Sequence, residues 1–256
     1  MTPKDIALAA FRSIFVDFDV VTAERLLAAD YVQHNVGVPT GAAPILGFIP
    51  ALKQSGIRGT IHRVIAEDNL VVLHGTYENA QAFGGDVLVA FDVFRVENGK
   101  VAEHWDNLQP LVSKTASGNG MTDGPTQIVD REKTTENKAL ITGFVRDVLQ
   151  GADPARVADY ISTETYTQHN PLVANGLEGL GAALKIFAEM GQAMSYSRTP
   201  IIVAEGNFVF TASEGTLGAT PTAFFDLFRI ENGKIVEHWD TISSIPSQMP
   251  HTNGKF

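Results

Sequence analysis

The chain has no cysteine among its 256 residues. Disulfide bonds, thiolate metal ligands and cysteine nucleophiles are therefore excluded. It also lacks any run approaching the ~18 consecutive apolar residues that a membrane-spanning helix needs. The first five residues lack the basic region of a secretory signal peptide, and Arg12, Asp17 and Asp19 interrupt the apolar stretch that follows. We therefore expect a cytoplasmic protein with no membrane partner.

Basic residues are scarce as well. The chain has 19 Lys and Arg against 29 Asp and Glu, a net charge of −10. Nucleic acids attract clustered Lys and Arg, so no nucleic-acid partner is expected. Neither a His-x-His nor a His-Glu-x-x-His spacing occurs, and Gly84-Gly85 follows no phosphate-loop pattern. We therefore expect no metal and no nucleotide.

What the chain does contain is a long repeat. Residues 91–106, FDVFRVENGKVAEHWD, recur as FDLFRIENGKIVEHWD at 225–240, with twelve identical positions. The segment YVQHN at 31–35 likewise recurs as YTQHN at 166–170. A period this long indicates two complete domains. The predicted boundaries are domain 1 at 1–112, a polar Gly-rich linker at 113–136 and domain 2 at 137–256.

Each copy begins with helical patterns and continues with strands. Thr2-Pro3 before Asp5 marks the start of the first helix. Further helices are expected at 22–29 and 45–54, and in the second copy at 154–161 and 177–190. Strands are expected at 60–66, 70–78, 87–96 and 100–108. Because short turns join these strands, the predicted class is α+β with an antiparallel sheet.

The hairpin inside the repeat allows two registers. A two-residue turn at Asn98-Gly99 sets Asp92 opposite Trp105, whereas a three-residue loop with Gly99 in the left-handed conformation sets Asp92 opposite His104. We favour the three-residue loop because it separates the charged side chains better between the two faces of the hairpin.

The favoured register sends Arg95 and Glu103 to one face, where they can pair. The other face then carries a polar and aromatic set in each copy: Asp92, Phe94, His104 and Asp106 in the first, and Asp226, Phe228, His238 and Asp240 in the second.

Three motifs together resemble a known family. They are Tyr-x-Gln-His-Asn after two helices, a Val-Ala-Glu-Gly-Asn type of turn, and the repeated hairpin with its Glu-Asn-Gly-Lys-x-x-Glu-His-Trp-Asp string. They resemble the SnoaL-like proteins, named after a polyketide cyclase, in the nuclear transport factor 2-like superfamily that also contains ketosteroid isomerase. The resemblance covers both halves. It implies two tandem cone-shaped domains, each with about three N-terminal helices packed on a curved antiparallel sheet around a deep apolar pocket.

The resemblance also implies site residues. Asp106 and Asp240 match the acid/base Asp of the cyclases, and Asp92 and Asp226 match an acidic donor in the isomerases' oxyanion hole. The expected catalytic residues are Asp106, His104, Asp92, Asp240, His238 and Asp226. The expected substrate-binding residues are His34, Asn35, Phe94, His169, Asn170 and Phe228, with the histidines 34 and 169 at the pocket rim.

The residues support such chemistry independently. A carboxylate in a dry pocket has a raised pKa, which suits a base that removes a proton α to a carbonyl. The enolate then needs a hydrogen-bond donor, which a protonated Asp or His supplies. We expect a cofactor-independent aldol cyclase, isomerase or related lyase acting on a small apolar carbonyl compound in each domain. The alternatives are a non-catalytic binding protein with the same pocket and a structural module.

Simpler explanations stand beside these roles. Asp92 can be a buried acid satisfied by His104, and His34 can cap a loop. Trp105 and Trp239 are expected to pack on the outer face or at a domain contact. Both pockets are expected to exist and to bind different ligands, or the same ligand unequally. Because single-copy relatives commonly dimerise, the fused copies are expected to form an intramolecular pseudodimer that can pair again.

Overall fold

The computed structural model describes residues 1–256, which form two compact units. Unit 1 contains residues 1–111 and 246–256, and unit 2 contains residues 112–245. These boundaries differ from the expected ones at two places. The expected linker, 113–136, belongs to unit 2, because its backbone is hydrogen-bonded to that unit at Pro171 and Asn207. The end of the chain, 246–256, belongs to unit 1, because Asn253 and Gly254 are hydrogen-bonded to Gln33 and His34 of that unit.

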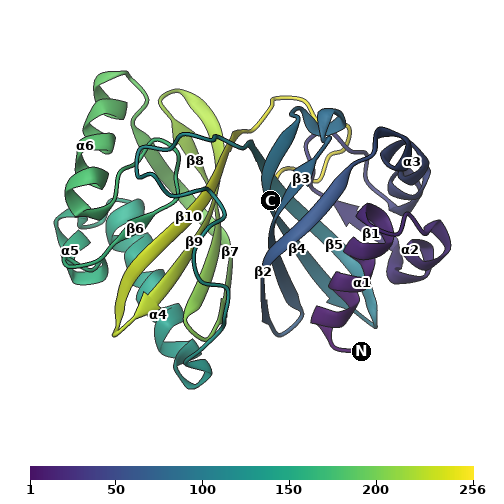
Figure 1. The fold of residues 1–256 in the computed structure, drawn as a ribbon, viewed down its shortest axis with the longest axis horizontal. Coiled ribbons are helices and arrows are strands. Elements are labelled where there is room, and N and C mark those ends of the chain that lie inside the picture. The colour runs from purple at the N-terminus through teal and green to yellow at the C-terminus, as the bar shows by residue number, and fades with distance from the viewer. The chain divides into compact units, whose positions relative to one another are not determined.

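Unit 1 packs its helices against one face of a five-stranded sheet (Figure 1). The strand order is β1-β5-β4-β3-β2, with β1 parallel to β5 and the other neighbours antiparallel. The elements are α1 (Pro3–Phe15), α2 (Val20–Leu26), β1 (Leu27–Gln33), α3 (Ala42–Ser55), β2 (Arg58–Glu67), β3 (Leu70–Glu78), η1 (Gln81–Phe83), β4 (Val87–Glu97) and β5 (Lys100–Pro110).

Unit 2 repeats this plan with the strand order β6-β10-β9-β8-β7, in which β6 is parallel to β10. The α+β class and the tandem arrangement are therefore confirmed. The elements are η2 (Arg131–Lys133), α4 (Thr134–Phe144), η3 (Val145–Leu149), η4 (Pro154–Arg156), α5 (Val157–Tyr160), β6 (Thr167–Gln168), α6 (Gly176–Glu189), β7 (Met194–Glu205), β8 (Phe208–Leu217), β9 (Thr220–Glu231) and β10 (Lys234–Ser244). No helix in the chain is long and apolar enough to cross a membrane.

The start of α1 is the one that the sequence predicts. The Thr2 hydroxyl accepts a hydrogen bond from the Asp5 backbone N–H at 3.2 Å, and the Asp5 carboxylate accepts one from the Thr2 N–H at 2.8 Å. This reciprocal capping box satisfies two N–H groups that the helix leaves unpaired. It orients α1 so that Ile6, Phe11 and Ile14 enter the core.

The first strand of each sheet was not predicted. The expected helix at 22–29 ends at Leu26, and Leu27–Gln33 forms β1 beside β5. Each sheet is therefore mixed, not wholly antiparallel. The reason is non-local: pairing with the edge of β5 outweighs a weak local helix preference. In unit 2, the helix expected at 154–161 is reduced to η4 and the short α5.

The hairpin of β4 and β5 has a two-residue turn, so the three-residue loop was wrong. Asn98 and Gly99 both have positive φ, 51° and 76°, as a type I′ turn requires. The register shifts by one residue just beyond the turn, and Asp92 then pairs with Asp106. This bulge adds one residue to β5, which restores the expected faces. The β9–β10 hairpin has the same turn and pairs Asp226 with Asp240.

Candidate functional site

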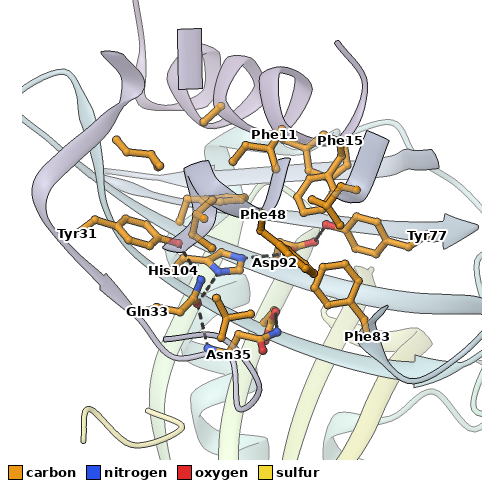
Figure 2. Close-up of a pocket in the computed structure, with 18 of the residues that line it drawn as sticks. Phe11, Phe15, Tyr31, Gln33, Asn35, Phe48, Tyr77, Phe83, Asp92 and His104 are labelled. Atoms are coloured by element: carbon orange, nitrogen blue, oxygen red, sulfur yellow. Dashed lines mark hydrogen bonds and ion pairs between the residues drawn. The ribbon is translucent and has the colours of Figure 1, made fainter. Parts of the chain in front are cut away.

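Unit 1 encloses a small cavity between its helices and the sheet (Figure 2). Its volume is about 50 Å³, and aromatic and aliphatic side chains form most of its wall. The polar part of the wall comes from the end of β1 and from the repeated hairpin: Gln33, Asn35, Asp92, His104 and Asp106. The structure thus brings together the expected catalytic residues of the first copy, with Asn35 and Phe94 beside them.

Gln33 fixes the proton on one nitrogen of His104. The Gln33 Oε1 accepts hydrogen bonds from the backbone N–H groups of His34 and Asn35, at 3.0 and 2.9 Å. The same oxygen lies 2.9 Å from His104 Nδ1. Since this carbonyl oxygen only accepts, His104 Nδ1 must carry a proton and donate it.

The other nitrogen of His104 faces Asp92, with Nε2 3.0 Å from Oδ1. Because Nδ1 is already protonated, Nε2 either donates to an ionised Asp92 or accepts from a protonated one. In both states the pair has the same number of protons. That number is one more than in a neutral His104 beside an ionised Asp92. The Tyr77 hydroxyl donates to Asp92 Oδ2 at 2.9 Å. Burial is the largest influence on Asp92 and raises its pKa.

Asp106 is buried beside this pair and is 5 % exposed. The Asn35 amide donates to its Oδ2, whereas its Oδ1 has no hydrogen-bond partner. The Lys255 ammonium lies 3.7 Å from that Oδ1 and also contacts the Asp106 backbone carbonyl. Burial lowers the pKa of Lys255, against the opposing charge of Asp106.

Unit 2 repeats the same polar contacts around a larger cavity of about 310 Å³. His238 Nδ1 lies 2.9 Å from Gln168 Oε1, and its Nε2 lies 3.0 Å from Asp226 Oδ1. The Asn170 amide donates to Asp240 Oδ2 at 2.7 Å. Asp226, His238, Asn170 and Phe228 line the cavity, whereas Asp240 is not part of its wall.

Two groups in unit 2 have shifted pKa values. Burial is the largest influence on Asp240 and, with the charge of Asp226, raises its pKa to about 6. Burial alone would lower the pKa of His238. The hydrogen bond to Asp226 and the charges of Asp240 and Asp226 outweigh burial and raise it.

His34 and His169, expected at the pocket rim, lie on the other face of the sheet. Side chains alternate along extended backbone, so Gln33 faces the cavity and His34 faces away from it. His34 Nε2 lies 2.9 Å from Glu103 Oε1, and its ring stacks on Trp105 with centroids 5.0 Å apart. His169 makes the same contacts with Glu237 and Trp239, at 2.9 and 4.7 Å. Both tryptophans therefore lie on the outer face, as expected.

Sequence reasoning missed several residues of the site. Gln33 and Gln168 lie inside the repeated Tyr-x-Gln-His-Asn motif, so the repeat itself was a signal for them. Tyr77 and Tyr196 gave no such signal. Each tyrosine hydroxyl donates to the Asp that pairs with the histidine, Asp92 or Asp226, which we call the inner Asp; Asp106 and Asp240 are the outer Asp. The Tyr196 hydroxyl lies 3.4 Å from Asp226. The two tyrosines come from non-equivalent strands, β3 and β7.

The same residues could also hold a metal ion. One ligand atom from each of Asp92, His104 and Asp106 lies within 4.8 Å of the other two, and Asp226, His238 and Asp240 form the same set. These ligands come from two strands, which explains why no short spacing in the sequence reveals them. A cation would have to replace the existing hydrogen bond between the His and the inner Asp. The expectation of no metal stays a prediction.

Comparison with known proteins was made at the levels of family, sequence and structure. The model of the SnoaL-like domain matches twice, at residues 8–104 and 141–238. A search of curated proteins gave no match. IdmH from Streptomyces antibioticus, a candidate polyketide cyclase, is 18 % identical, with 43 % of this chain and 93 % of that chain covered and a TM-score of 0.35.

Two further solved structures are similar. TsrD from Streptomyces laurentii is 17 % identical, with 42 % of this chain and 88 % of that chain covered and a TM-score of 0.36. An LEH-like epoxide hydrolase from M. tuberculosis is 18 % identical, with 42 % and 82 % covered and a TM-score of 0.34. With both copies matched by the family model, the chain belongs to the SnoaL-like domain family.

Proposed function

We propose that the protein is a cofactor-independent acid/base enzyme, an aldol cyclase, isomerase or related lyase, acting on a small apolar carbonyl compound. One observation carries this proposal. Each copy has a hydrogen-bonded Asp-His pair that lines an apolar cavity, and a second buried Asp lies beside that pair. A proton donor and a proton acceptor side by side are what enolate chemistry requires.

In the proposed reaction the Asp92–His104 or Asp226–His238 pair donates a hydrogen bond to the substrate carbonyl oxygen, using the proton that the two residues share. The outer carboxylate, Asp106 or Asp240, removes a proton from the carbon next to that carbonyl. The electrons of the broken C–H bond move into the enolate, whose oxygen the donor stabilises. Attack of the enolate carbon on a second carbonyl forms the aldol bond and moves the π electrons of that carbonyl onto its oxygen, which then takes the proton held by Asp106 or Asp240. Return of that proton to carbon instead gives isomerisation or exchange.

In unit 2 the proposed base is in contact with the cavity wall. Asn170, which lines the cavity, donates a hydrogen bond to Asp240.

The test is isotope exchange, which needs no knowledge of the natural substrate. We expect the protein to accelerate exchange of the α-protons of 2-tetralone, a compact apolar ketone, in D2O, followed by proton NMR. The double variant Asp106→Asn, Asp240→Asn is expected to lose about 100-fold or more of that acceleration, the usual contribution of a positioned base. Circular dichroism and thermal unfolding check that the variant is folded. Bound ketone with no faster exchange than in buffer would reject the enzyme.

A non-catalytic binding protein is the second candidate. One observation favours it: the wall of the larger cavity is mostly apolar and Asp240 is not part of it. For a binder, the ketone remains bound with equal affinity in the double variant, and no exchange is measured in either protein. The cytoplasmic location, the absence of nucleic-acid and membrane partners, and the pairing of the copies as a pseudodimer stay predictions.

A further inference from the structure

The two cavities differ most in size. The cavity in unit 1 measures about 50 Å³ and the cavity in unit 2 about 310 Å³. Cavities that bind small organic ligands measure roughly 300–1,000 Å³. The second cavity reaches the lower end of that range, whereas the first is several times smaller.

Aromatic rings fill the space in unit 1. Phe15 packs on Tyr77 with centroids 4.9 Å apart, and Phe48 packs on Phe83 at 5.9 Å (Figure 2). Phe83 lies in the connection between β3 and β4, residues 79–86, which includes η1. Unit 2 has no such segment, because a two-residue turn, Gly218-Ala219, joins β8 to β9. The longer connection therefore supplies Phe83, which narrows the first cavity, and the second copy has no equivalent of this residue.

The copies also differ at one position in the segment that follows each hairpin. Asn253-Gly254-Lys255 matches Asn119-Gly120-Met121 in the repeat, and the two Asn side chains make the same contact, to the Gln33 and Gln168 carbonyls at 2.9 and 3.1 Å. Lys255 and the buried Met121 thus occupy equivalent positions.

This exchange changes the charge at that position. Lys255 places its Nζ 3.7 Å from Asp106 Oδ1, whereas Met121 carries no charge and its sulfur accepts from the Val112 N–H.

We propose that ligand binding and turnover take place in the second copy, and that the first copy keeps the same polar set around a cavity that aromatic rings make too small for a ligand. The turnover half of this proposal rests on the proposed function, whereas the binding half does not. The size and mostly apolar wall of the second cavity suit a compact, uncharged, largely apolar compound, and the carbonyl group of that compound rests on the proposed function.

Two helical glycines allow a controlled test. Gly181 in α6 lines the second cavity, whereas Gly47 in α3 does not line the first. A Cβ added at either glycine meets no atom within 4 Å. Gly181→Phe therefore fills the second cavity, and Gly47→Phe makes the same helical change in the other copy.

The probe for binding is prodan, an uncharged fluorescent aryl ketone. We expect one equivalent of prodan per wild-type chain by fluorescence titration. Gly181→Phe is expected to weaken binding ~10-fold or more by occupying the cavity, and Gly47→Phe to leave it unchanged. Two equivalents per wild-type chain, or loss of binding in Gly47→Phe with retention in Gly181→Phe, would overturn the proposal.

The same variants separate binding from turnover. With 2-tetralone in D2O, we expect Gly181→Phe to lose accelerated exchange and Gly47→Phe to keep it. If no protein accelerates exchange, the proposed function fails, but the prodan stoichiometry still decides which copy binds. If Gly181→Phe loses prodan and keeps exchange, turnover belongs to the first copy and the proposal is wrong.

Discussion

A single carboxamide sets the proton chemistry at the residue scale. Gln168 Oε1 accepts from the backbone N–H groups of His169 and Asn170, both at 3.0 Å, so its orientation is fixed. His238 then has to donate from Nδ1, which leaves Nε2 to exchange a proton with Asp226. A glutamine with no acid/base chemistry of its own thereby selects the histidine nitrogen that reacts.

Replacing Gln168 should remove the hydrogen bond that fixes the His238 tautomer. In Gln168→Met we expect His238 to lose its fixed Nδ1–H and to populate both neutral tautomers, measured by 15N NMR of the ring nitrogens. Gln168→Glu is the control, because a carboxylate oxygen still accepts from all three N–H groups. An unchanged His238 tautomer in Gln168→Met would show that Asp226 alone sets the ring.

The pH profile of exchange follows from the shifts in unit 2. Asp240 acts as a base only when ionised, so the rate should rise with pH to a midpoint near 6, where burial has placed its pKa. His238 supplies the donor proton and has a pKa above its ordinary value of 6.5, so the rate should fall again only above that pH. A bell-shaped profile of the 2-tetralone exchange rate is the expected result. A rising limb near pH 4 would exclude Asp240 as the base.

At the scale of elements, one β-bulge decides which side chains of the hairpin face the cavity. The type I′ turn alone would place Asp92 and His104 on opposite faces of the hairpin. The extra residue in β5 turns His104 and Asp106 back toward the cavity and leaves Arg95 facing Glu103, at 2.7 Å, on the other side.

Gly99 should therefore be sensitive to substitution. Its φ of 76° is strained for any residue with a Cβ, so Gly99→Ala is expected to destabilise unit 1 by about 1 kcal/mol or more, measured by urea unfolding. Asn98→Gly, at the neighbouring positive φ of 51°, is the control and should be neutral or slightly stabilising. Equal stability of Gly99→Ala and wild type would mean that the turn adopts another type in solution.

The elements also show what a sequence can predict. Local signals predicted the α1 cap and the extent of β3, and the charge pattern predicted which side chains share a face. The edge strand β1 could not be predicted because its partner β5 lies ~70 residues away in the chain. The Tyr77 and Tyr196 contacts could not be found by matching the copies, because different strands supply the same hydroxyl.

At the scale of the whole molecule, each copy is completed by the segment that follows the other copy's last strand. We call residues 246–256 the C-terminal strap and residues 112–130 the middle strap. The C-terminal strap belongs to unit 1, where the Gly254 carbonyl lies 2.9 Å from His34 Nδ1. The middle strap belongs to unit 2, where the Gly120 carbonyl lies 2.6 Å from His169 Nδ1.

Removing the C-terminal strap should damage the first copy and not the second. Deletion of 246–256 is expected to increase hydrogen exchange of the β1 and β5 amides, because their cover and the contacts of Asn253 and Lys255 are lost. The amides of β6 and β10 should keep their protection, measured by exchange mass spectrometry. Asn119→Ala, in the middle strap, is the reciprocal control and should affect β6 in preference to β1. Loss of protection at β10 on deleting 246–256 would contradict this assignment.

The exchanged straps have an evolutionary consequence. Lys255 is encoded at the end of the second repeat, yet it acts on Asp106 in the first; Met121 is encoded after the first repeat and lies in the second unit. A mutation at Lys255 or Met121 therefore changes the unit built mainly from the other repeat. Neither repeat alone encodes a complete unit, so the two are expected to change together in evolution.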